Sequence, residues 1–222
     1  MGVINTGGED MTREEQKKLR ELNHALPQII KSEIKKYKLK KKDYMVWFQK
    51  NDLFFSLLID VRERDGHCYC SSIEQIKPMW IDDLLWDILG MPENKNEPVS
   101  LRAIGAFTVY GSEIYSTEEE LVSWEPNELE KYVVQYLENF YQNIQLCEIE
   151  KFYECMHVSP YHQELRKGLS LIHNGEYQKA IDYLETCDEG SLCNRGIWSN
   201  TAMIKYSKRK IKGLGKFRLF KQ

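Results

Sequence analysis

The sequence has no apolar run long enough to cross a bilayer and no secretory signal among its first residues. A membrane-spanning helix needs roughly 18 consecutive apolar residues, and the longest runs here, such as 57–59, are far shorter. A secretory signal would show a basic segment followed by an apolar one, and residues 1–10 show neither. We therefore expect a cytosolic protein that does not contact a membrane.

Motifs with recognisable chemistry are also missing. The chain contains no GxSxG, no HExxH, no phosphate-binding glycine loop and no dinucleotide fingerprint. Its six cysteines include no pair at the spacing of a zinc knuckle, so we expect free thiols, no structural metal and no cofactor. His67, Cys68 and Cys70 remain a weaker zinc alternative. No catalytic residue is assigned, although carboxylates such as Asp60 and Asp82 leave an enzyme without a known motif open.

Charge of neither sign is in excess. Thirty-one Lys and Arg oppose 34 Asp and Glu, which gives a formal net charge of −3 and argues against binding a polyanion over the whole surface. With 42% hydrophobic and 12% aromatic residues, a chain of 222 residues can bury a core of its own. The composition predicts one globular domain with an appendage, or two small domains.

The pattern of apolar residues predicts an α+β fold for residues 12–158. A capping box at Thr12 and Glu15 begins a helical stretch over 12–37, and helical periodicity returns at 80–89 and 126–144. Between these helices the period changes to two, which indicates strands; their ranges are 44–48, 53–61, 68–73 and 99–110. Short turns between strands favour antiparallel pairing, so we expect a four-stranded antiparallel sheet covered by helices.

The last third of the chain, 159–222, is predicted to be a helical appendage with a basic C-terminal tail. It resembles one tetratricopeptide unit, with a small residue in the first helix, a glycine at the turn and small or apolar residues packing between the helices. These positions are Gly168, Gly175, Tyr177, Ala180 and Leu184. A single unit does not make a solenoid, so the resemblance implies a helix pair that presents a binding face.

Two stretches also resemble a bacterial family known as domain of unknown function 4304. They are residues 39–48, which lead into the first hairpin, and residues 80–90 through 101–107. The resemblance covers roughly residues 15–145. It implies a bacterial, cytosolic α+β protein and supplies no catalytic residue.

Charge is distributed unevenly along the chain. From 190 to 222 there are nine Lys and Arg and no acid, whereas 113–154 carries eleven acids against two lysines. The basic tail either docks on the acidic helix of the same chain or binds an anionic partner. The residues that we predict to bind a partner are Trp86, Asp87, Arg102, Lys205, Lys208, Arg209 and Lys210.

These observations favour a protein that acts by binding another protein, as an interaction or immunity module. The helix pair suits that role, and no catalytic motif competes with it. Nucleic-acid binding through the basic tail is the alternative.

Overall fold

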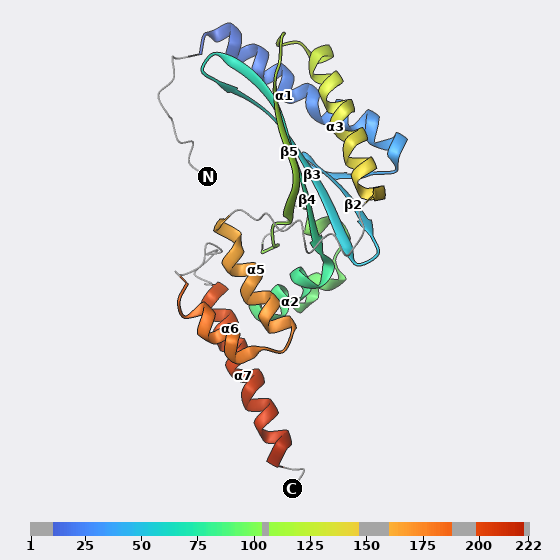
Figure 1. The fold of residues 1–222 in the computed structure, drawn as a ribbon. Helices are drawn as coiled ribbons and strands as arrows, with labels where there is room; N and C mark the ends of the chain where they lie inside the picture. The colour runs from blue at the N-terminus through green and yellow to red at the C-terminus, as the bar shows by residue number, and fades with distance from the viewer. Residues whose placement is uncertain (1–10, 104–106, 147–159, 188–198, 220–222) are drawn as a thin grey trace. The chain divides into compact units, whose positions relative to one another are not determined.

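The computed structural model describes residues 11–103, 107–146, 160–187 and 199–219. They form two compact units (Figure 1). The first takes its described residues from 11–50, 55–76 and 113–146, and the second from 51–54, 77–112 and 160–219. Residues 77–112 thus group with the C-terminal helices, so the units do not follow one cut in the sequence. The division into 12–158 and 159–222 stays a prediction about folding domains.

The first unit contains the sheet and two long helices. Its elements are α1 (Arg13–Glu33), η1 (Ile34–Tyr37), β1 (Lys40–Lys42), β2 (Met45–Lys50), β3 (Leu53–Arg64), β4 (His67–Pro78), β5 (Ser112–Glu120) and α3 (Pro126–Leu146). The end residues 53–54, 77–78 and 112 of three strands group with the second unit. The α+β fold class is therefore confirmed.

The strands follow one another in chain order, β1-β2-β3-β4-β5. β1 pairs antiparallel with β2, with Lys40 opposite Trp47 and Lys42 opposite Met45. The predicted tight turns lie between β2 and β3 and between β3 and β4, where Asn51 and Asp65 have φ of 53° and 55°. Positive φ suits the two-residue turns that join twisted antiparallel strands. The hairpins predicted from residues 44–73 are present.

The sheet has five strands instead of four, and the predicted strand at 99–110 is wrong. Residues Val99–Arg102 form a 3₁₀ helix, η3, and Phe107 has a φ of 65°, which a strand does not allow. The last strand is instead β5, and β1 lies in the lysine-rich segment 40–42, where no strand was predicted. Both are edge strands, where lysines and glutamates are common because they discourage pairing with another chain. Because their residues are mostly polar, these two strands lack the apolar alternation from which strands were predicted.

The helix α3, predicted from residues 126–144, covers one face of the sheet beside α1 (Figure 1). It reaches two strands through polar contacts. The Tyr136 hydroxyl donates to the Cys70 carbonyl at 3.0 Å, and Lys50 Nζ donates to the Ile144 carbonyl at 2.8 Å. The capping box of α1 is also present, because the Glu15 amide donates to Thr12 Oγ1. The apolar stripes of both helices are buried, at Leu22, Leu26, Ile30, Leu129, Val133, Leu137, Phe140 and Ile144.

The second unit is a layer of helices around one apolar cluster. Its helices are α2 (Met79–Leu89), η2 (Pro92–Asn96), η3 (Val99–Arg102), α5 (Pro160–His173), α6 (Tyr177–Leu184) and α7 (Ser199–Leu219). α5 and α6 form the expected helix pair, with Gly175 at φ +75° in the turn. They approach closely at Gly168, where an added Cβ would lie 2.8 Å from Leu184 Cδ2. No helix in the described part of the chain is long and apolar enough to cross a membrane.

The buried Glu74 of β4 makes the stability of the first unit depend on pH. Its carboxylate is 1% exposed and accepts from Asn143 Nδ2 at 2.8 Å, and burial raises the pKa of Glu74 to about 7. Between about pH 4.5 and pH 7, Glu74 is therefore protonated in the folded state and ionised in the unfolded state, where its pKa is near 4.5. We expect the free energy of unfolding to fall as pH rises from about 4.5 through 7, by roughly 3 kcal/mol.

Glu74→Gln should remove this dependence, because the amide keeps an acceptor for Asn143 without a charge. Urea unfolding at pH 5 and pH 8 should give equal stabilities for variant and wild type at the lower pH and a more stable variant at the higher pH. Glu138→Gln, on the exposed side of α3, is the matched control. A Glu74→Gln variant that is no more stable than wild type at pH 8 would contradict the expectation.

Candidate functional site

A buried network of charges joins the end of β4 to α2 and to residues 102–109 of the second unit. Lys77 Nζ lies 2.9 Å from Asp82 Oδ2 and also donates to the carbonyls of Arg102 and Val109, at 2.9 and 2.7 Å. Asp82, which is fully buried, accepts in turn from the Val109 amide at 2.8 Å. All three donors of the Lys77 ammonium are thereby used.

Burial dominates the electrostatics of this network. It lowers the pKa of Lys77, and the neighbouring positive charge of Arg102 acts in the same direction, while Asp82 opposes both. A lysine with a lowered pKa can serve as a base, but here every donor is held by a fixed acceptor of the chain. The geometry indicates that Lys77 anchors the backbone at Arg102 and Val109.

The structure brings two of the predicted binding residues, Trp86 and Arg102, into this same network. Arg102 is 7% exposed, and its guanidinium contacts the Met79 carbonyl at 2.8 Å and Asp83 Oδ1 at 2.6 Å. It also lies over the Trp86 ring, 4.7 Å from the centroid. Trp86 is 1% exposed and donates through Nε1 to the Phe107 carbonyl at 3.0 Å. The polar groups of both residues are engaged by the chain itself.

Asp87, the other predicted residue on α2, lies on the outer side of this helix. Its Oδ2 is 2.6 Å from Lys95 Nζ of η2, and about a third of each side chain is exposed. An exposed pair of this kind contributes about 0–1 kcal/mol. Of Trp86, Asp87 and Arg102, only Asp87 is exposed to a partner.

A basic groove lies along α7, in the same unit. It is a pocket of about 600 Å³ lined by Glu185, Thr201, Ile204, Lys205, Lys208, Arg209 and Lys212. Its α7 residues recur at intervals of three and four, so they share one face of the helix. Three predicted residues, Lys205, Lys208 and Arg209, therefore line one cavity. We call it the α7 groove.

The opposite side of α7 holds the helix in place. Met203 and Ser207 are fully buried, and Met203 belongs to the apolar cluster formed with α2, α5 and α6. The fourth predicted residue on this helix, Lys210, does not line the groove. Its ammonium lies over the Tyr206 ring, 5.1 Å from the centroid, and the hydrogen bond with Tyr206 raises the pKa of Lys210.

One acid lies within the groove and was not anticipated. Glu185, just after α6, has Oε1 at 3.2 Å from Lys208 Nζ, and both side chains are more than half exposed. Part of the basic charge is thus paired inside the second unit. The sequence offered no signal for this contact, since the two residues are 23 positions apart.

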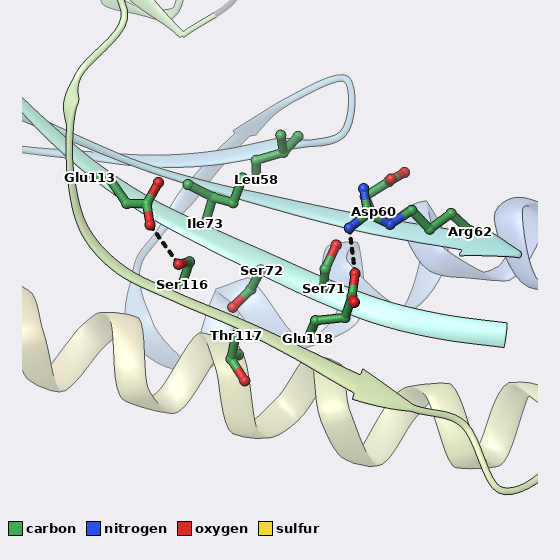
Figure 2. A pocket seen from close by; sticks show the side chains of 10 residues that line it. All are labelled: Leu58, Asp60, Arg62, Ser71, Ser72, Ile73, Glu113, Ser116, Thr117 and Glu118. Atoms are coloured by element: carbon green, nitrogen blue, oxygen red, sulfur yellow. Dashed lines mark hydrogen bonds and ion pairs between the residues drawn. The ribbon is translucent and has the colours of Figure 1, made fainter. Parts of the chain in front are cut away.

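The open face of the sheet in the first unit carries a second pocket, of about 450 Å³. In Figure 2, Glu118 of β5 points toward Arg62 of β3, and Ser116 lies against Glu113. Arg64 Nη2 also reaches Glu118, at 2.9 Å, and the hydrogen bond from Arg62 lowers the pKa of Glu118. Asp60 lines this pocket, whereas Asp82 belongs to the second unit. The carboxylates considered for acid–base chemistry therefore do not form one cluster within either unit.

Side chains alternate along β4, and this separates the three residues that were considered as zinc ligands, His67, Cys68 and Cys70. Cys68 and Cys70 are fully buried on β4, while His67 is exposed and lies 2.6 Å from Glu120 Oε1. Burial raises the pKa of the Cys68 thiol to about 11 and that of Cys70 to about 12, so neither is readily a thiolate. Both are free thiols, as is Cys187. Cys147, Cys155 and Cys193 lie outside the described residues.

Comparison with protein-family models, with curated proteins and with solved structures finds no match to this chain. The resemblance to domain of unknown function 4304 stays a prediction.

Truncating Trp86 should be among the most damaging single changes in the second unit. Trp86→Ala removes a buried ring that Arg102 and the Phe107 carbonyl both contact, and the loss of a buried aromatic typically costs about 3–5 kcal/mol. Asp87→Ala, the neighbouring control, should cost less than about 1 kcal/mol. The free energy of unfolding in urea measures both. Equal and small losses for the two variants would show that Trp86 does not support the core.

Proposed function

We propose that the protein binds an acidic segment of another protein in the α7 groove. The single observation that carries the proposal is the composition of that pocket, in which four cations, Lys205, Lys208, Arg209 and Lys212, face one acid, Glu185. Opposite charge at such a surface steers a partner and fixes its register. The exposed ammonium and guanidinium groups are hydrated in the free protein, so they pair without a large desolvation cost.

The groove suits a peptide better than a nucleic acid for two reasons. Ile204 gives the groove an apolar lining residue, and none of the described residues that line it is aromatic. Proteins that bind single strands usually stack bases on aromatic side chains. Glu185 would also repel phosphates, whereas a peptide can place a cation or a backbone amide against it.

The packing of α5, α6 and α7 also supports a peptide as the partner. Gly168 lets α5 and α6 approach closely, and α7 follows as a third helix packed on both. Helical units of the tetratricopeptide type use such arrangements to present rows of side chains to extended or helical peptides. The interaction or immunity role expected from the sequence is consistent with such a surface.

A charge-reversal experiment tests the proposal. Two fluorescein-labelled probes are titrated with the full chain at about 0.15 M salt: a 20-residue peptide of Glu interspersed with Leu, and an oligothymidylate of equal charge. We expect the peptide to bind more tightly. Lys205→Glu with Arg209→Glu should weaken peptide binding by at least about tenfold, a change of about 1.4 kcal/mol.

The matched control is Lys167→Glu with Lys179→Glu, which changes the net charge equally at exposed positions of α5 and α6 that do not line the groove. It should leave the affinity within about twofold, because salt screens exposed charges that do not contact the peptide. Equal losses for the two double variants would contradict a site in the groove. Tighter binding of the oligothymidylate, with a steep dependence on salt, would show a nucleic-acid surface instead.

A further inference from the structure

Arg166 of α5 is a buried cation whose hydrogen-bonding groups are not all used. Its side chain is 4% exposed, and neither Nε nor Nη1 has an acceptor among the residues that the structure describes. Burial lowers the pKa of Arg166 to about 10, which still leaves it charged at neutral pH. Buried guanidinium groups in folded proteins are normally paired with acids or carbonyls, because an unpaired one loses its hydration without compensation.

Arg166 acts on a network that already contains two cations, Lys77 and Arg102, beside the two carboxylates of Asp82 and Asp83. Its helical neighbour Leu165 packs in the cluster that includes Val109, the residue whose carbonyl accepts from Lys77. The charge of Arg166 is also among the causes that lower the pKa of Lys77. α5 therefore brings a third cation to the network of Lys77 and Arg102.

Neither acid of this network accepts a hydrogen bond from Nε or Nη1 of Arg166. Asp82 contacts Lys77, Arg102 and the Val109 amide, and Asp83 contacts Arg102. Three cations thus share two described carboxylates, and the excess positive charge falls on the residue whose nitrogen atoms lack acceptors. An anion placed against Arg166 would balance the charge and accept from those nitrogen atoms.

We propose that Arg166 forms an anion site that takes a small oxyanion of the phosphate or sulfate class. The guanidinium supplies a permanent charge and planar N–H donors, which match the oxygen atoms of a tetrahedral anion better than the point charge of a lysine does. The site is separate from the α7 groove, because none of the groove residues is part of it. It differs from the groove in being shielded from solvent, so salt should screen it less.

Phosphate titration of the full chain tests the site. Thermal unfolding is followed in increasing inorganic phosphate, with sodium chloride adjusted to hold the ionic strength constant. We expect a saturable rise in Tm of about 3 °C or more, since an anion that binds only the folded state stabilises it by mass action. Arg166→Met should abolish the rise. Lys167→Met, the exposed neighbour on α5, should keep it.

A second variant covers the case in which Arg166→Met does not fold. Arg166→Lys keeps the charge but loses the planar donors, and calorimetric titration should show phosphate binding at least about fivefold weaker than in wild type. The Lys205→Glu and Arg209→Glu variant should keep the full response, which separates this site from the α7 groove. A Tm that phosphate raises no more than chloride, or a rise that survives Arg166→Met, would overturn the proposal. So would an Arg166→Lys variant with wild-type affinity.

Discussion

The pairing of Lys77 with Asp82 is the contact on which the second unit depends. Lys77 lies near the end of β4 and Asp82 in the first turn of α2. Lys77 donates to the carbonyls of Arg102 and Val109, and Asp82 accepts from the Val109 amide. Without the ammonium, two buried carbonyls would lose their donor, and Asp82 would keep only its longer contact with Arg102, at 3.4 Å. The pair thus fixes the backbone at Arg102 and Val109. The same contacts position Trp86 and the apolar cluster on which α5, α6 and α7 pack.

The second unit contains two cationic sites, the α7 groove and Arg166, and they differ in their exposure to solvent. The α7 groove is exposed, so its lysines and Arg209 are hydrated, screened by salt and suited to a partner that comes and goes. Arg166 lies on the buried side of α5, where a charge interacts more strongly and must be balanced. The first unit contributes differently, because Glu118 already pairs with Arg62 and Arg64 on the open face of its sheet. Both cationic sites therefore belong to the second unit.

The sequence predicted those parts of the fold that local patterns determine. The cap at Thr12, the turn at Asn51 and the stripe of α3 are local, and each was found where expected. The edge strands β1 and β5 were missed because lysine and glutamate runs carry no apolar alternation. The uneven distribution of charge also placed Lys205, Lys208 and Arg209 among the predicted binding residues, and all three line the α7 groove. Lys77, Glu185 and Arg166 were missed because what matters about them, burial and distant partners, arises only when separate segments meet.

A double-mutant cycle on Lys77 and Asp82 tests most directly whether their contact holds the second unit together. The variants Lys77→Met and Asp82→Asn, and their combination, are compared with wild type by urea unfolding at neutral pH. Each single change removes the nearest charged partner of a buried group and should cost about 3–5 kcal/mol. The combined change should cost at least about 2 kcal/mol less than the sum of the two, because residues in contact are coupled. Additive losses would contradict the account.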